Sequence, residues 1–284
     1  MKKKGPFFLV VKEFSLDMKV GFIGIGNMGG AILNGFAAKS DRAAVKIFAF
    51  DADASKLAAA EKDKGVTVCG NIGELVERSE IIMLGVKPDA YESVLPLIAG
   101  TYNDTKILIS MVTGVSISLI ESGLGKTAKI IRIIPNTPAL VGAGMTAVCR
   151  NENVKDSDML WPIVIFESIG KTCEIPEGLM HCVIGVSGSS PAYTYMYIDA
   201  LAEAAVKNGM EKDMALTFAA QSVLGAAKMV METGADPVQL RINVCSPGGT
   251  TIEAVQKLQE KKFTEVIAEG FQAAVDKSKA MTRS

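Results

Sequence analysis

Short apolar runs alternate with amphipathic stretches through the first 150 residues of the chain. The runs are rich in β-branched residues and have the length of strands, whereas the stretches between them have a helical period. The runs that predict strands are Met18 to Ile25, Val45 to Asp51, Glu80 to Val86, Lys106 to Val112, Lys129 to Pro135 and, at the sheet edge, Met145 to Arg150. This rhythm is typical of a parallel, doubly wound sheet.

From Asn153 onward the pattern is nearly all helical. Ser190 is placed to cap one helix with Pro191 at its first position, and Asn208 and Gly209 end it. The next helix is expected over Glu211 to Thr233 and ends at Gly234. Both helices are rich in Ala and Met around most of their circumference, and such helices are usually buried. A domain of this size offers little to bury them, so we expect a second subunit to cover them. A compact monomeric bundle is the alternative.

These patterns predict an α/β Rossmann-type N-terminal domain, residues 18–168, and an all-α C-terminal dimerisation domain, residues 169–284. The join is expected near Phe166 to Gly170. Residues 1–17 resemble a signal peptide, because lysines precede the apolar run Phe7 to Val11. That run is short and charged residues follow it at once, so we expect a dispensable extension.

Composition narrows the function further. The formal net charge of −1 gives no electrostatic footprint for nucleic acid, and no window approaches the ~18 uninterrupted apolar residues of a membrane span. Five cysteines, an odd number without a C-x-x-C pair, argue against a disulfide framework and against a zinc site. We expect a cytoplasmic protein that acts on a small molecule and needs no metal, nucleic acid or membrane.

The stretch GFIGIGNMGGAI carries a dinucleotide-binding motif. Gly24, Gly26 and Gly29 form G-x-G-x-x-G directly after a predicted strand and at the start of a predicted helix, which is the context that the motif requires. Gly24 allows a tight turn, Gly26 lets a pyrophosphate approach, and Gly29 permits close packing of helix on strand. The first amides of the helix, at Asn27 and Met28, would receive the phosphates. The alternative is a glycine-rich turn without a ligand.

Asp51 ends the second predicted strand, about 20 residues past the last glycine. A carboxylate there usually binds the ribose 2′-hydroxyl of NAD and would repel the 2′-phosphate of NADP. After Asp51, the next cation along the chain is Lys56, so the immediate neighbours Ala52 and Asp53 offer no charge to compensate the carboxylate. The alternative is that Asp51 caps the helix that begins near Ala54.

A second glycine pair stands in VCSPGGTTIEAV, where glycine weakens a helix by roughly 1 kcal/mol relative to alanine. Ser246 is placed to cap this helix and Pro247 to occupy its first position. The amides of Gly248, Gly249 and Thr250 would then be free to bind an anion, commonly a carboxylate. An ordinary capped helix is the alternative.

The chain has one histidine, His181, so neither a Ser-His-Asp triad nor a cluster of histidine ligands for a metal can form. We interpret His181 as a core or interface residue. A hydride acceptor that is already cationic or easily protonated by water needs no strong protein acid, and an imine has that property.

The segments FIGIGNMGGAI, LGVKP, RIIPNTP, VSGSSPAY and VCSPGGTTIEAV occur in an order and spacing that resemble delta-1-pyrroline-5-carboxylate reductases. The resemblance covers Met18 to about Met281. It implies a homodimer, possibly within a higher ring, with NADPH or NADH on the N-terminal domain. It further implies reduction of (S)-1-pyrroline-5-carboxylate to L-proline, the last step of proline biosynthesis.

The same resemblance assigns roles to individual residues. Ser246, Gly248, Gly249 and Thr250 would hold the substrate carboxylate, and the Thr251 hydroxyl would donate toward the ring nitrogen. Lys87 and Asn136 match loops on the cofactor side, although a surface lysine and a turn former are simpler readings of them. Many members carry a serine or an arginine-bearing loop where this chain has FDADAS, so the preferred cofactor stays open.

Two other functions fit parts of the sequence. A 3-hydroxyacid dehydrogenase has a similar domain order but uses a helix lysine as acid and base, and the helix after Ser190 offers none until Lys207. A non-catalytic protein that senses a dinucleotide is the alternative of another class.

Overall fold

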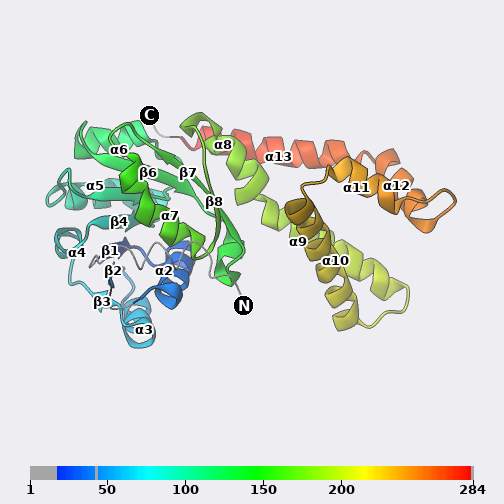
Figure 1. The fold of residues 1–284 in the computed structure, drawn as a ribbon, viewed down its shortest axis with the longest axis horizontal. Helices are drawn as coiled ribbons and strands as arrows, with labels where there is room; N and C mark the ends of the chain where they lie inside the picture. The colour runs from blue at the N-terminus through cyan, green and yellow to red at the C-terminus, as the bar shows by residue number, and fades with distance from the viewer. Residues whose placement is uncertain (1–17, 42–43, 283–284) are drawn as a thin grey trace. The chain divides into compact units, whose positions relative to one another are not determined.

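The computed structural model describes residues 18–41 and 44–282 (Figure 1), so the expected extension 1–17 lies outside the described residues. The chain forms two compact units. One unit comprises the chain up to Gly188 together with residues from Val275 onward, and the other comprises Ser189–Ala274. The sequence placed the start of the second domain at residue 169, about one strand and one short helix earlier.

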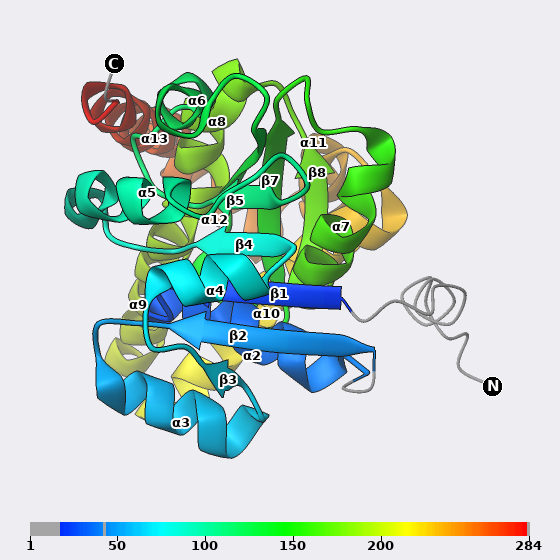
Figure 2. The same cartoon turned by 90° about the vertical axis from the view of Figure 1, so that its left-hand side faces the viewer.

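The first unit is built on an eight-stranded sheet in the order β3-β2-β1-β4-β5-β6-β7-β8. Figure 2 shows the strands in this order, from β3 beside α3 to β8 beside α7. The strands are β1 (Met18–Ile23), β2 (Val45–Phe50), β3 (Thr67–Val68), β4 (Ile81–Leu84), β5 (Ile107–Ser110), β6 (Lys129–Ile134), β7 (Gly144–Arg150) and β8 (Gly170–Glu174). The first six in this spatial order are mutually parallel, as the alternating pattern predicts.

The sheet changes direction at its far edge. β7 pairs with β6 in antiparallel register, and β8 then pairs with β7 in parallel. The expectation that the chain is nearly all helical after Asn153 is therefore wrong for β8. Its sequence, GKTCE, has no apolar run, because no residue of this edge strand is buried.

Helices cover both faces of the sheet, as in doubly wound folds. On one face, apolar side chains of α2 (Asn27–Lys39) and α7 (Leu160–Glu167) pack on the strands. On the other face, α4 (Ile72–Arg78), α5 (Tyr91–Ala99) and α6 (Ile117–Leu124) do the same. The unit also contains α3 (Ala54–Lys64), α8 (Met180–Val183), a π-helical turn η5 (Ile184–Gly188), and the 3-10 turns η1 (Pro88–Ala90), η2 (Thr137–Val141), η3 (Asp156–Met159) and η4 (Glu177–Leu179).

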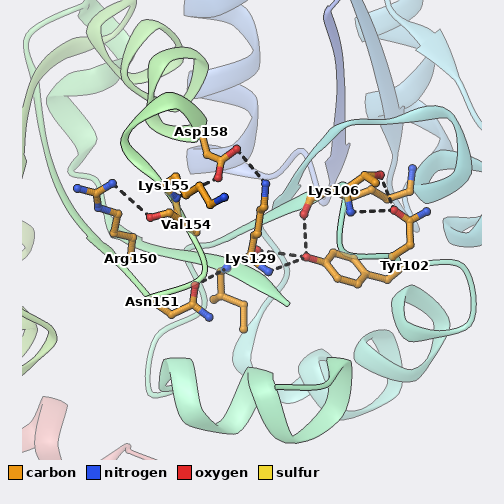
Figure 3. A network of polar contacts seen from close by, with 11 residues as sticks. Tyr102, Lys106, Lys129, Arg150, Asn151, Val154, Lys155 and Asp158 are labelled. Atoms are coloured by element: carbon orange, nitrogen blue, oxygen red, sulfur yellow. Dashed lines mark hydrogen bonds and ion pairs between the residues drawn. The ribbon is translucent and has the colours of Figure 1, made fainter. Parts of the chain in front are cut away.

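A polar network ties the amino ends of β5 and β6 together (Figure 3). The Tyr102 hydroxyl donates to the Lys106 carbonyl at 2.9 Å and accepts from the Lys129 amide at 3.1 Å. Burial raises the pKa of Tyr102 to about 12, so the hydroxyl stays protonated. The Lys106 ammonium donates to the Ser79 carbonyl at 2.6 Å and the Lys129 ammonium pairs with Asp158 at 2.9 Å. Ligands of such folds bind at the carboxyl ends of the strands. This network lies at the opposite, amino ends, so we interpret it as stabilising the fold.

The second unit is helical. Its helices are α9 (Ser190–Lys207), α10 (Lys212–Thr233), α11 (Pro237–Val244), α12 (Thr250–Glu260) and the first part of α13 (Phe263–Ala280). α9 and α10 end at Asn208 and Gly234 as predicted, and α10 ends in a left-handed glycine. The expected cap of α9 at Ser190 is wrong, because Ser189 is the N-cap and Pro191 is the second residue of the helix. They share a small core of Ala202, Ala215 and Ala219.

Large apolar side chains of this unit are exposed in the single chain. Met196, Phe218 and Leu224 are 73%, 61% and 60% exposed. Large apolar side chains of this kind are usually buried. Within the described part of the chain, α10 is the one helix long and apolar enough to cross a membrane, by length and composition alone. A helix that packs between two subunits has the same composition.

Candidate cofactor and substrate sites

The three motif glycines differ in what surrounds them. A Cβ at Gly24, where φ is +86°, would lie 2.7 Å from the Gly85 carbonyl oxygen, and a Cβ at Gly29 would lie 2.2 Å from the Gly24 carbonyl oxygen. Both positions therefore require glycine for backbone packing, as predicted. A Cβ at Gly26 would meet no atom within 4 Å. Open space beside the middle glycine is what the approach of a pyrophosphate requires.

The helix behind this loop begins as the motif predicts. α2 starts at Asn27 with Gly26 as N-cap, and no side chain of the described residues caps it. The first amides, including those of Asn27 and Met28, are thus left for a ligand at the positive end of the helix dipole.

Asp51 holds the glycine loop in place. Its carboxylate accepts the Ile25 amide at 2.8 Å and the Asp53 amide at 2.9 Å. The reading of Asp51 as a helix cap is wrong, because Asp53 is the N-cap of α3 and accepts the Ser55 amide. Hydrogen bonds from Ser55 hold the pKa of Asp53 below its usual value, so this cap is charged at neutral pH.

A cation lies beside these carboxylates. The Lys56 ammonium is 3.7 Å from the nearer Asp51 oxygen and 3.8 Å from the nearer Asp53 oxygen. In the sequence, Lys56 is only the next cation after Asp51. The first turn of α3 places its ammonium beside the Asp51 carboxylate. The negative charge that would face a 2′-phosphate is therefore partly offset.

Two cavities flank the glycine loop. One, of about 370 Å³, is lined by Gly24, Gly26, Asp51, Lys56 and Lys87 among others. The other, of about 260 Å³, is lined by Met28, the loop after β5 and the end of β6. Gly85 and Val86, which follow β4, line both. The strand order reverses between β1 and β4, and dinucleotides bind in the crevice at such a switch point.

Asn136 is placed differently from Lys87. Its side-chain oxygen accepts the Met145 amide at 2.8 Å, and its side-chain nitrogen donates to the Ser187 hydroxyl at 3.2 Å. Its neighbours Ile134 and Pro135 line the 260 Å³ cavity, whereas Asn136 lines neither cavity. The amide thus joins β7 to the π-helical turn, and its contact with a cofactor stays a prediction.

Arg132 is a residue of this site that the sequence reasoning missed. It lines the 260 Å³ cavity, is 5% exposed, and pairs with Glu177 at 2.8 Å. Glu177 also accepts the Ile117 amide at 2.9 Å. The charge at Arg132 lies between apolar neighbours on both sides in the strand KIIRII, and this signal could have pointed to it.

The SPGGTT segment forms a turn before its helix. α12 begins at Thr250 with Gly249 as N-cap, so the expected cap at Ser246 with Pro247 in the first turn is wrong. The Gly249 amide donates to the Ser246 carbonyl at 3.0 Å, and Gly248 adopts a φ of +70°. The glycines therefore shape a tight turn, and no side chain within the described residues caps the helix. Of the three amides expected to be free, the Gly249 amide is therefore engaged within the turn. Thr250 is exposed, and Thr251 beside it is half-buried.

His181 lies within the first unit and contacts the end of the chain. Its Nδ1 is 2.8 Å from the Ser278 hydroxyl oxygen. Burial, followed by the nearby Arg132 and Lys279 charges, lowers its pKa, so the imidazole is neutral at neutral pH. This placement agrees with a packing role. In the part of the chain that the structure describes, no group of three or more His, Cys, Asp or Glu side chains could hold a metal ion.

A mostly parallel sheet whose strand order reverses, with a glycine loop at the switch point, defines a dinucleotide-binding protein of the Rossmann class. The comparisons with known proteins agree and go further. Residues 19–114 match the family described as NADP oxidoreductase, coenzyme F420-dependent, and residues 177–281 match the pyrroline-5-carboxylate reductase dimerisation family.

Relatives cover nearly the whole chain. Pyrroline-5-carboxylate reductase of Escherichia coli is 42% identical over 95% of this chain and all of its own length, and human pyrroline-5-carboxylate reductase 2 is 35% identical over 90% of this chain and 82% of its own. The crystal structure of Plasmodium falciparum pyrroline carboxylate reductase with NADP bound has a TM-score of 0.85 at 33% identity, covering 95% of this chain and all of the other. The chain belongs to the pyrroline-5-carboxylate reductase family.

Proposed function

We propose that the chain is an NAD(P)H-dependent pyrroline-5-carboxylate reductase, which reduces (S)-1-pyrroline-5-carboxylate to L-proline in the last step of proline biosynthesis. The observation that carries the proposal is that two helices begin at a glycine N-cap with no side-chain cap, Gly26 before α2 and Gly249 before α12, in a chain 42% identical to the Escherichia coli enzyme over its full length. Each end suits one anionic partner: the cofactor pyrophosphate and the substrate carboxylate.

The cofactor site would extend along both cavities. Gly24, Gly26, Asn27, Met28 and Gly29 provide the pyrophosphate end, and Asp51 and Lys87 line the adenosine side. The 260 Å³ cavity beyond Met28 would take the nicotinamide, which when bound supplies the hydride. Asn136 would support the cavity lining from behind Ile134 and Pro135, through its hydrogen bonds to Met145 and Ser187. NADH and NADPH both fit a site in which Lys56 offsets Asp51.

The substrate site would use the turn before α12. Ser246, Gly248, Gly249 and Thr250 would hold the pyrroline carboxylate, the glycines by shaping the turn and Thr250 by its exposed amide. Thr251, one residue into the helix, would donate its hydroxyl toward the ring nitrogen. Hydride would add to C5 while the imine nitrogen takes up a proton and becomes an amine. These residues would position the ring, and the Thr251 hydroxyl would lie beside the nitrogen that gains the proton.

The assembly would be a homodimer, with a higher ring as the larger alternative. The exposed apolar side chains of α9 and α10 lie in the segment that matches the dimerisation family, and their burial against a second copy of the chain removes a large apolar surface from water. Burial against a second copy of the chain would also explain why α10 is so apolar, without a membrane. The net charge of −1 and five free cysteines suit a cytoplasmic enzyme with a small-molecule substrate and no nucleic-acid partner.

The test is a direct assay of the purified chain. Mixed with pyrroline-5-carboxylate and NADPH or NADH, it should consume the reduced nicotinamide, followed by its absorbance, and form proline in equal amount. A 3-hydroxyacid substrate with the oxidised cofactor should give no reaction. Cofactor binding without turnover of the imine would instead identify a dinucleotide-sensing protein.

A further inference from the structure

The end of the chain returns to the first unit. Residues from Val275 onward are part of the unit that contains the glycine loop, although the rest of α13 is not. Val275 and Ser278 are 7% and 4% exposed, so this last turn and a half of α13 is anchored by buried side chains. We call Val275 to Met281 the C-terminal strap.

One contact joins the strap to α8. Ser278 is a buried polar residue whose hydroxyl lies 2.8 Å from Nδ1 of His181. His181 is the second residue of α8, and Met180 beside it is fully buried in the core of the sheet. Three residues after His181, Ile184 begins the π-helical turn and lines the 260 Å³ cavity.

A second contact joins the strap to the loop after β5. A Cβ at Gly114 would lie 2.3 Å from the Met281 carbonyl oxygen, so the two backbones touch at a distance that only glycine allows. Gly114 has a φ of +79°, and the Val115 amide donates to the Val112 carbonyl at 3.4 Å, as in a type II turn with glycine in its third position.

This loop forms another wall of the same cavity. Met111, Val112 and Thr113, which precede Gly114, line the 260 Å³ cavity opposite the segment that Ile184 begins. The strap thus contacts two elements that share one cavity: a turn at Gly114 and a helix at His181. Neither contact reaches the cavity itself.

We infer that the C-terminal strap is a positioning element, which holds the Met111–Val115 loop and α8 in the arrangement that shapes the nicotinamide end of the cofactor site. The inference rests on the proposed function, because it takes the 260 Å³ cavity as the nicotinamide site. Gly114, His181 and Ser278 act through the loop and the helix, so they are positioning residues. The last residues of the chain then affect cofactor binding without touching the cofactor.

The experiment combines a substitution with a truncation. Gly114→Ala forces the loop away from Met281, and a chain that ends at Ala280 removes the contact from the other side. The dissociation constants of NADPH and NADH, measured by fluorescence on the folded protein, should each rise about fivefold or more in either variant. The double variant should bind no worse than the weaker single one, because both changes break the same contact.

The matched control is Gly125→Ala. Gly125 also has a positive φ, +105°, but a Cβ there would meet nothing within 4 Å, so this variant carries backbone strain without a strap contact. It should leave both dissociation constants within twofold of the unaltered chain. Ser278→Ala, which keeps the backbone and loses the hydroxyl, should weaken binding two- to threefold and serves if Gly114→Ala does not fold.

The inference would be overturned if the truncated chain bound both cofactors as tightly as the unaltered chain. It would also be overturned if the rises in dissociation constant from Gly114→Ala and from truncation multiplied in the double variant. If the unaltered chain binds neither nucleotide, the proposed function fails and the strap fails with it. If it binds both but does not reduce the imine, the reductase assignment fails while the strap is still tested by the binding constants.

Discussion

The contrast between Gly26 and Gly29 gives a sharp test of the cofactor site, because the same substitution should act on binding at one position and on folding at the other. A methyl group at Gly26 enters open space, whereas one at Gly29 would lie 2.2 Å from the Gly24 carbonyl oxygen. We therefore expect Gly26→Ala to lose cofactor affinity with little loss of stability, and Gly29→Ala to lose stability first.

The magnitudes follow from the local geometry. Gly26 has a φ of −66°, which alanine adopts readily, so the entropic gain of about 0.4–1 kcal/mol roughly cancels the cost of alanine as an N-cap. The melting temperature should then move by less than about 4 °C. Loss of one charge-assisted hydrogen bond from an amide to the pyrophosphate costs about 1.5–3 kcal/mol, or roughly a 10- to 150-fold rise in Kd. Gly29→Ala overpacks a backbone contact and should cost at least about 1–3 kcal/mol of stability.

The assay pairs thermal unfolding with a titration of NADPH on each folded variant. Gly100→Ala is the control, since a Cβ at this helix end would meet its nearest neighbours at ordinary contact distances of 3.8 and 3.9 Å. It should change neither measurement. If Gly26→Ala bound NADPH as tightly as the unaltered chain, the open space beside Gly26 would not be the pyrophosphate site, and the motif reading would fall.

The remaining predictions concern the substrate, the cofactor preference and the assembly. Thr251→Ala should lower kcat/KM for the imine by about tenfold to a hundredfold, while Thr251→Ser should lose much less; equal activity of both variants and the parent would refute the donor role. Asp51→Ser should raise the ratio of kcat/KM for NADPH over NADH, and Lys56→Gln should lower it; an unchanged ratio in both would show that these side chains do not face the ribose. The chain should scatter light as a particle of at least twice 30.0 kDa at micromolar concentration, and a monomer would contradict the proposed interface.

Much of the first unit could be predicted because its strands are buried on both sides. The runs around Val20, Ile82 and Ile131 are continuous and apolar, since parallel strands between two helical layers contact no water. β8 was not predicted, because it is an edge strand with no buried residue and so has no apolar run in its sequence. The antiparallel direction of β7 was also missed, because β7 lies between β6 and β8 and a largely buried strand has the same apolar pattern in either direction.

The candidate sites were predictable where glycine has a backbone reason to occur. Gly24 and Gly29 are required by close contacts, and their spacing predicts the candidate cofactor loop. The start of α12 was misplaced by three residues, because Pro247 and two glycines fit a tight turn as well as a first helical turn. The approach of Lys56 to Asp51 and of Met281 to Gly114 depends on tertiary packing, which no local pattern encodes.

The strap also sets an order for synthesis of the protein. The first unit needs Val275 to Met281 for its last contacts, yet the whole segment 189–274 is made between the two parts. At about 5–20 residues per second, that segment occupies the ribosome for on the order of 4–17 s. During this interval the nascent sheet can form while Gly114 and His181 still lack their partners. The wall of the proposed nicotinamide pocket is therefore completed only once residues 275–281 have been made, and a chain that lacked them would carry a glycine loop whose neighbouring wall stayed open.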